Sequence, residues 1–142
     1  MRLTKYSDFA LRTLMYVALA KRRCTIDEIV DRYGIPKNHL IKVVNHLANL
    51  GYVASIRGKG GGIELADTPE NINIGEVVRS TEQSFDLVEC FSAEDDQCIL
   101  SRHCKLATVL ETALENFLAT LDEYCLQDIT TPKVSVILKL NK

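Results

Sequence analysis

Residues 25–50, TIDEIVDRYGIPKNHLIKVVNHLANL, contain two helix-forming segments joined by the short turn GIPK. Thr25 and Glu28 have the spacing of a capping box, which begins the first segment, and Gly34 ends it. The second segment has apolar residues at helical spacing, namely Leu40, Val43, Val44, Leu47 and Leu50. Two helices of this size joined by a turn that contains glycine are typical of a helix-turn-helix.

The stretch YVASIRGKGGGIELA follows directly. Two short alternating runs, residues 53–57 and 63–66, flank a glycine-rich tip, and this pattern predicts a β-hairpin. A phosphate-binding loop is disfavoured because the tip lacks a G-K-[ST] sequence and a following helix. A hairpin directly after a helix-turn-helix is the wing of a winged helix. Helical spacing of apolar residues also predicts a helix over residues 4–20, before the helix-turn-helix.

The remainder of the chain is predicted to be helical apart from one loop. A short helix over residues 74–82 has Asn73 and Glu76 as a cap pair, and a long helix covers residues 105–126. The apolar stripe of the long helix is too wide for the first helix alone to cover, which favours a homodimer built on the long helix. Its members are Leu106, Val109, Leu110, Ala113, Leu114, Phe117, Leu118, Leu121 and Cys125.

These segments together predict a mainly α fold with a small β-hairpin. Residues 1–67 form a winged helix-turn-helix domain whose first helix also packs on the dimerisation helix. Residues 68–104 form a short helix and a cysteine-containing loop, and residues 105–142 form the dimerisation helix and a C-terminal tail.

Charge is distributed unevenly along the chain, although the net charge is only −2. Residues 1–62 contain eleven Lys and Arg against four Asp and Glu, a balance of +7, whereas residues 63–142 contain six against fifteen, a balance of −9. A basic half of this kind favours a polyanionic partner. The alternative is that the two halves neutralise each other within the fold.

The basic half has the residues expected of a DNA-binding surface. The second helix of a helix-turn-helix enters the major groove with its N-terminal residues at the base edges. The candidate contacts on that helix and on the wing tip are Lys37, Asn38, His39, Lys42, Arg57 and Lys59. Further phosphate contacts are available from Lys5, Lys21, Arg22 and Arg23. Winged helices also mediate protein–protein contacts, but we predict double-stranded DNA, with a dyad-symmetric site for a dimer.

Several other classes of protein are disfavoured. No apolar run approaches the length of a membrane span, and Asp8 and Arg12 interrupt the N-terminal apolar stretch where a signal peptide would be continuous. We therefore expect a cytoplasmic protein, in which an odd number of cysteines, five, indicates metal, redox or core roles rather than disulfides. No nucleophile–base pair is evident, so we do not expect an enzyme.

Three of the cysteines, Cys90, Cys98 and Cys104, have the spacing C-x7-C-x5-C. Zinc sites prefer paired C-x2-4-C sequences, and His103 adjoins Cys104 too closely to be an easy fourth ligand. A thiol redox switch and inert structural cysteines remain open. An iron–sulfur cluster tolerates irregular spacing and is the favoured interpretation. Cys24 and Cys125 lie in helical contexts and are expected to be structural.

The sequence resembles the family of winged-helix iron–sulfur transcriptional regulators, the IscR/CymR/NsrR group, and is most similar to the NsrR-like, nitric-oxide-sensing branch. The resemblance covers almost the whole chain: MRLTKYSDFALRTLMY, IDEIVDRYGIPKNHLIKVVNHLANLGYV, RGKGGGIELA, INIGEVVRSTE and the three cysteines. It implies a repressor with one cluster per subunit, [4Fe-4S] in preference to [2Fe-2S], that releases DNA when nitric oxide reacts with the cluster.

The resemblance also implies a fourth ligand. IscR-like members use a histidine three residues after the last cysteine, where this chain has Ala107. NsrR-like members use an aspartate from the first helix of the partner subunit, and the matching residue here is Asp8, with Arg12 expected to orient it. On its residues alone, Asp8 is better explained by the helix dipole and an i,i+4 ion pair with Arg12 than by a ligand role.

Alternative functions remain at this point. The chain is also compatible with a winged-helix regulator that senses redox state or iron–sulfur status, through cluster loss or thiol oxidation, or that binds an organic effector. A cluster carrier or redox protein without an operator is a further possibility from a different class.

Overall fold

The computed structural model of the protein describes residues 2–92, 94, 96–100 and 103–140. The outermost residues of the predicted ranges 1–67 and 105–142, and four residues of the predicted loop, lie outside this part of the chain. In chain order the elements are α1 (Lys5–Ala20), α2 (Ile26–Tyr33), α3 (Lys37–Asn49), β1 (Val53–Ile56), β2 (Gly62–Leu65), η1 (Pro69–Asn71), α4 (Ile74–Thr81), η2 (Glu89–Phe91), α5 (Lys105–Asp122), α6 (Leu126–Ile129) and α7 (Pro132–Ile137). The predicted mainly α fold with one hairpin is confirmed.

The helix-turn-helix forms as its sequence predicts. The Thr25 side chain accepts a hydrogen bond from the Glu28 backbone, and the Glu28 side chain accepts one from the Thr25 backbone, so both halves of the capping box are present. Gly34 ends α2 in the left-handed conformation. The apolar stripe of α3 is buried except at Leu50, which caps the helix and is 41% exposed, so its predicted burial is wrong.

The hairpin is the predicted wing, and a third segment extends it. β1 and β2 pair antiparallel from Val53 opposite Leu65 to Ile56 opposite Gly62. On the other edge of β2, Cys24 and Ile63 exchange two backbone hydrogen bonds of 2.8 and 2.7 Å. The segment between α1 and α2 is therefore fixed to the wing.

Helix α1 lies between two hydrophobic clusters and contributes to both. The first cluster contains Ala10, Leu14, Ala18, Val43, Leu47, Val53, Ile72, Ile74, Val77 and Leu126. The second contains Tyr16, Val17, Cys24, Ile29, Ile35, Leu40, Val44, Ile63 and Leu138. Because Leu126 and Leu138 come from the C-terminal segments, the DNA-binding fold and the C-terminal tail share their cores.

The long helix α5 ends earlier than predicted. It stops at Asp122, after which the Ile74 amide bonds to the Tyr124 carbonyl (2.9 Å) and the Leu126 amide to the Ile72 carbonyl (2.8 Å). The predicted continuation to residue 126 is therefore wrong, and Cys125 lies at the start of α6 rather than on the stripe of α5. The bonds to residues 72 and 74 replace those of a continued helix.

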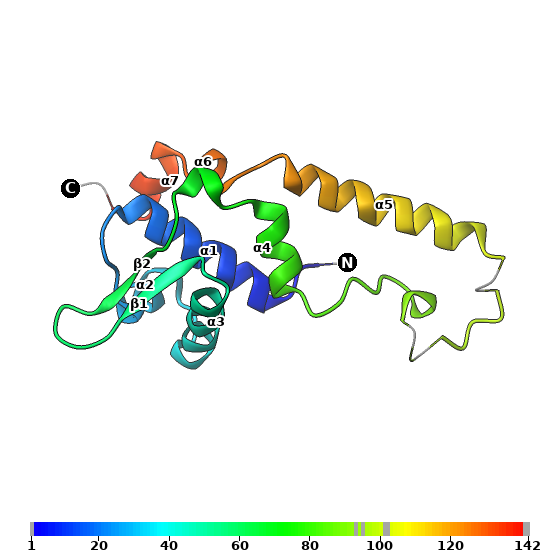
Figure 1. The fold of residues 1–142 in the computed structure, drawn as a ribbon, viewed down its shortest axis with the longest axis horizontal. Helices are drawn as coiled ribbons and strands as arrows, with labels where there is room; N and C mark the ends of the chain where they lie inside the picture. Colours follow the sequence, from blue (N-terminus) through cyan, green and yellow to red (C-terminus); the bar gives the residue numbers. More distant parts are fainter. Residues whose placement is uncertain (1, 93, 95, 101–102, 141–142) are drawn as a thin grey trace.

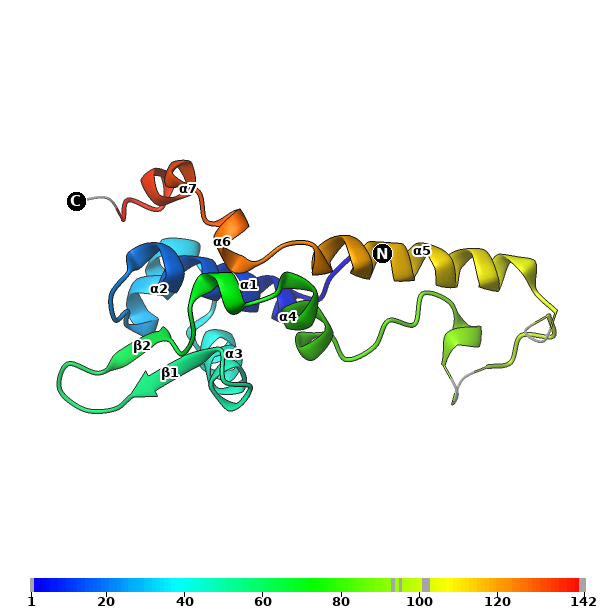
Figure 2. The same cartoon turned by 45° about the horizontal axis from the view of Figure 1, so that its top comes forward.

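Figures 1 and 2 show α5 extending from the α4 side of the DNA-binding fold, with the cysteine-containing loop at its far end. Within the chain, α5 packs mainly on α4. The predicted packing of α1 on the dimerisation helix remains a prediction about the assembled dimer. In the described part of the chain, no helix is both long and apolar enough to cross a bilayer.

Candidate DNA-binding surface and metal centre

The four predicted contact residues of α3 are exposed at its N-terminal half. Lys37 donates to Asp27 of α2 over 2.7 Å, although both side chains are more than half exposed. Among the residues that the structure describes, His39 and Lys42 form no ion pair, and the Asn38 amide is likewise exposed. The surface thus presents an amide, an imidazole and an ammonium group, which are the kinds of side chain that contact base edges and phosphates in protein–DNA complexes.

Helix α1 packs against α3 and contacts two of the residues of this surface. The Tyr6 hydroxyl donates to the Lys42 carbonyl over 3.3 Å, and the Phe9 and His39 rings have centroids 6.4 Å apart. Burial raises the pKa of Tyr6, so its hydroxyl remains a hydrogen-bond donor. Sequence reasoning missed Tyr6 as a support of α3, because only the helix packing brings residues 6 and 42 together.

The wing tip is placed as predicted. Arg57 and Lys59 are exposed on the loop between β1 and β2. Two of the further basic residues instead form ion pairs within the chain: Arg22 with Glu28 (2.9 Å) and Arg23 with Glu64 (3.3 Å). Their predicted role as phosphate contacts therefore competes with these pairs.

The three loop cysteines are half-buried thiols. Cys90 lies in η2, Cys98 in the following loop, and Cys104 immediately before α5. The pKa of Cys90 is raised, first by desolvation and then by the charges of Cys98, Asp96 and Cys104. These groups therefore lie close enough for their charges to interact.

The donor chemistry of this loop fits an iron–sulfur cluster, for which thiolates are the ordinary ligands. Within the residues that the structure describes, no three His, Cys, Asp or Glu side chains are arranged as a ready metal site. The thiols of Cys90, Cys98 and Cys104 are the side chains of this loop that could hold such a cluster.

Asp8 lies in the first turns of α1 and accepts a hydrogen bond from the Arg12 guanidinium over 2.9 Å. The side chains of Asp8 and Arg12 are 43% and 45% exposed, so the pair remains accessible to a second molecule. In both views α1 and the cysteine-containing loop lie apart within one chain. The structure confirms the contact between Asp8 and Arg12 and does not bring Asp8 to its own chain's cysteines.

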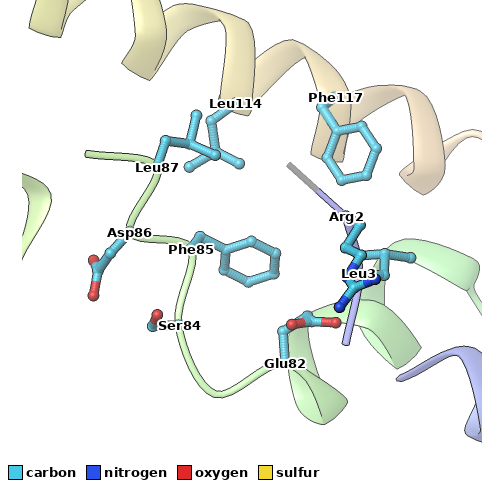
Figure 3. A pocket seen from close by; sticks show the side chains of 9 residues that line it. All are labelled: Arg2, Leu3, Glu82, Ser84, Phe85, Asp86, Leu87, Leu114 and Phe117. Carbon is cyan, nitrogen blue, oxygen red and sulfur yellow. The ribbon is translucent and has the colours of Figure 1, made fainter. Parts of the chain in front are cut away.

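A cavity of about 460 Å³ lies between the N-terminus, the segment after α4 and α5 (Figure 3). Its apolar lining consists of Leu3, Phe85, Leu87, Leu114 and Phe117. At its edge, Glu82 accepts hydrogen bonds from the Thr4 amide (2.8 Å) and hydroxyl (3.1 Å). This contact joins the beginning of α1 to the chain that leads into the cysteine-containing loop, and no sequence signal predicted it.

The other two cysteines differ from the loop cysteines. Cys24 is completely buried, and burial is the main cause that raises its pKa to about 11. Its Sγ donates to the Arg22 carbonyl over 3.3 Å, and the Cys125 Sγ donates to Asp128 over 3.1 Å. Cys24 lies in a β-bridge with Ile63 and Cys125 at the N-cap of α6, so the predicted helical contexts are wrong; the structural roles remain a prediction.

Helix α5 presents an unusually exposed apolar surface. None of its residues is buried, and Leu106 and Val109 are 62% and 54% exposed. In the loop before it, Ile99 and Leu100 are 98% and 60% exposed. Exposed apolar side chains of this size are typical of surfaces that another molecule covers.

Comparison with known proteins gives a consistent result. The profile of the Rrf2 family, described as an iron-dependent transcriptional regulator, matches residues 3–132. The chain is 52% identical over 131 residues to the HTH-type transcriptional regulator NsrR of Bacillus licheniformis, covering 91% of this chain and 92% of that protein. It is 49% identical over 139 residues to the protein of the same name from Bacillus subtilis strain 168, covering 96% and 95%.

Solved structures show the same fold. The chain superposes on IscR of T. potens with a TM-score of 0.72 at 21% identity, covering 91% of this chain and 85% of that one. It superposes on CymR of B. subtilis with a TM-score of 0.68 at 23% identity, covering 92% and 96%. These identities are low, so the two structures support the architecture alone.

Proposed function

This chain belongs to the Rrf2 family of iron-dependent transcriptional regulators, and we propose that it is a dimeric, cytoplasmic repressor that holds an iron–sulfur cluster and leaves its DNA site in response to nitric oxide. The observation that carries the proposal is the presence of three half-buried thiols in one loop, at the far end of the exposed helix α5 from a winged-helix domain. The same residues do not suggest an enzyme.

The DNA-binding part of the proposal rests on α3 and the wing. Lys37, Asn38, His39 and Lys42 are all exposed on one half of α3, and Arg57 and Lys59 are exposed at the wing tip. The helix is proposed to enter the major groove, and the wing to approach the adjacent backbone or minor groove. Two such units favour an operator with dyad symmetry.

The dimer part rests on the apolar surface of α5. A helix that buries none of its residues and exposes Leu106 and Val109 is unfavourable in water, at about 25 cal/mol for each Å² of apolar area. A second copy can cover this surface by packing its own α5 alongside. Closed twofold pairing uses the same patch on both subunits, as expected for a homodimer.

The proposed ligands are Cys90, Cys98 and Cys104 of one subunit and Asp8 of the other. Asp8 is suited to this role because its carboxylate is exposed and already oriented by Arg12. The bound cluster, [4Fe-4S] in preference to [2Fe-2S] and one per subunit, would supply an iron centre that reacts with nitric oxide. A carboxylate is a weaker ligand for such a centre than a thiolate, so Asp8 is the ligand most readily released.

We propose that release of Asp8 weakens DNA binding through a movement of α1. Helix α1 contacts α3 and carries Tyr6 against Lys42, so a shift of α1 changes the position of the DNA-contacting residues. The Thr4–Glu82 contact ties the same end of α1 to the chain leading into the cysteine-containing loop. A coupling of roughly 1–3 kcal/mol between the two sites is enough to release an operator.

Native mass spectrometry of protein purified without oxygen tests this proposal. A dimer with two [4Fe-4S] masses is expected, and nitric oxide should then abolish binding to the operator. A [2Fe-2S] mass would support redox or cluster-status sensing instead. A bare or zinc-loaded dimer would overturn the cluster, and regulation that survives replacement of all three loop cysteines would favour an organic effector.

A further inference from the structure

The wing tip is a glycine-rich loop whose two basic residues require a defined orientation to contact DNA. Such loops lose much conformational entropy when they are ordered, so a loop without anchors contributes little to affinity. Arg23 lies between α1 and α2. Its side chain forms hydrogen bonds with Glu64 of β2 and with Gly60 of the loop.

Arg23 contacts the wing at two polar points. Its Nη1 donates to the Gly60 carbonyl over 3.0 Å, at the tip, and its Nε donates to Glu64 over 3.3 Å, on β2. Its own backbone neighbour, Cys24, is bonded in both directions to Ile63. The backbone next to Arg23 is therefore held against β2, and the guanidinium extends from it to the loop.

The packing around Arg23 leaves little freedom. Gly62 has a φ of +147°, and a Cβ there would lie 2.5 Å from the Cys24 carbonyl oxygen and 3.0 Å from the Cγ of Arg23. Gly62 therefore permits the close approach of the 23–24 segment to the wing. The loop itself closes with a bond of 2.9 Å from the Gly61 amide to the Gly58 carbonyl.

We propose that Arg23 is a positioning residue of the wing, which holds the tip loop so that Arg57 and Lys59 face DNA, rather than a phosphate contact of its own. The Arg23 and Glu64 side chains are 40% and 43% exposed, so their ion pair adds little to folding stability. The expected effect of the Arg23–Glu64 ion pair is instead to order the five-residue loop between β1 and β2. The fork of donors on a guanidinium suits this task, since it reaches a carboxylate and a carbonyl together.

This inference rests on the proposed DNA-binding function, and it is tested by four variants measured on the cognate operator: Arg23→Gln, Arg23→Lys, Arg57→Ala and Arg23→Gln with Arg57→Ala. If Arg23 acts through the wing, Arg23→Gln should weaken binding by up to the factor lost in Arg57→Ala. Adding Arg57→Ala to the Arg23→Gln variant should then reduce the affinity for the operator only slightly further. Arg23→Lys should resemble Arg23→Gln, because Lys keeps the charge and loses the fork.

A direct phosphate contact gives the opposite results. The losses would then be additive, and Arg23→Lys would retain affinity because it keeps the positive charge. Any of these outcomes overturns the positioning role while the DNA-binding function stands. If Arg57→Ala has no effect on specific binding, the wing contact of the proposed function fails instead.

Hydrogen exchange of the free protein supplies a readout that is independent of DNA. Arg23→Gln should increase exchange at the amides of residues 58–61 and leave α3 unchanged. Arg22→Gln is the control, since Arg22 pairs with Glu28 of α2 (2.9 Å) and donates to the Arg23 carbonyl (3.0 Å), and neither partner is a residue of the wing. Unchanged exchange at the tip in Arg23→Gln would overturn the inference.

Discussion

The guanidinium of Arg79 on α4 donates two hydrogen bonds to the carboxylate of Asp122, the last residue of α5, with Nη2 and Oδ2 2.7 Å apart. The bidentate pair fixes the point at which the long helix joins the DNA-binding fold. Gly75, one turn before Arg79, faces the same carboxylate. These three residues meet where the C-terminal end of α5 joins α4.

Gly75→Ala should destabilise the protein. An added Cβ would collide with the Asp122 carboxylate and lie 2.8 Å from the Arg79 guanidinium, so the ion pair between these two side chains must shift or break. The loss of stability should be small, because both side chains are partly exposed and can rearrange. Thermal unfolding checks the prediction, with Glu76→Ala, an exposed neighbour, as the control. A melting temperature equal to that of the wild type would contradict it.

The stability of the protein at acid pH should depend on Asp122. Hydrogen bonding to Arg79 is the main cause that holds the pKa of Asp122 below its usual value. A lowered pKa in the folded state gives stability that is present above the unfolded pKa of about 3.9 and is lost as the pH falls through the folded pKa. Asp122→Asn should therefore lose less stability than wild type between pH 5 and pH 3, a range of about two units around that pKa.

Urea unfolding at several pH values measures this difference. Glu115→Gln, which removes another exposed carboxylate from α5, is the control and should follow the wild-type dependence. Equal losses in Asp122→Asn and wild type would show that the contact with Arg79 is not maintained in solution.

The five cysteines should react with N-ethylmaleimide at very different rates in metal-free protein. Cys24 is completely buried with a pKa of about 11, so little thiolate is available to react near neutral pH. Cys90, Cys98 and Cys104 are half-exposed and should be modified first. Peptide mass spectrometry measures the order, and unfolded protein provides the control in which all five react. Modification of Cys24 as fast as the loop cysteines would contradict the burial.

Asp8→Ala should make the proposed cluster labile and leave the dimer intact. Loss of the cluster absorbance under air should accelerate by about tenfold or more, and Arg12→Ala should have a smaller effect in the same direction. Asp31→Ala removes an equal charge from the exposed surface of α2 and is the matched control. An unchanged rate in Asp8→Ala would remove this residue from the proposed ligands.

Lys42→Ala and Asn38→Ala should affect DNA binding differently. A lost phosphate contact lowers the salt slope by about 0.9, and we expect this of Lys42→Ala on any sequence. A lost base contact costs about 1–3 kcal/mol on the operator alone, and we expect this of Asn38→Ala. Lys133→Ala, on the exposed side of α7, is the control. Fluorescence anisotropy at several salt concentrations separates the two effects, and identical behaviour of both variants would contradict the assignment.

Local signals in the sequence predicted most of the fold. The capping box at Thr25 and Glu28, the left-handed end at Gly34 and the alternating strands around the glycines all act over a few residues, so they can be recognised before folding. The end of α5 could not be predicted in this way. Its helical spacing continues to Cys125, and only the backbone bonds to residues 72 and 74 end it.

The residues of the candidate site likewise fall into those that the sequence predicts and those that only the fold brings together. The three loop cysteines follow from their spacing, and the exposed residues of α3 follow from the helix-turn-helix. Asp8 as a ligand came from resemblance alone, because its contact with Arg12 has an ordinary local explanation. The contacts of Arg23 with the wing and of Glu82 with Thr4 join residues 37 to 78 positions apart, and no pattern in the sequence indicates them.

The shared cores have a consequence for how the protein is made. Leu126 and Leu138 fill the two clusters of the DNA-binding fold, although they are synthesised long after the residues they contact. On the ribosome, the winged helix therefore emerges with both clusters incomplete and becomes fully stable only when translation of α7 is finished. Nascent chains that stall before this point should be substrates for chaperones and should not bind DNA, which delays operator occupancy until the cysteine-containing loop has also been translated.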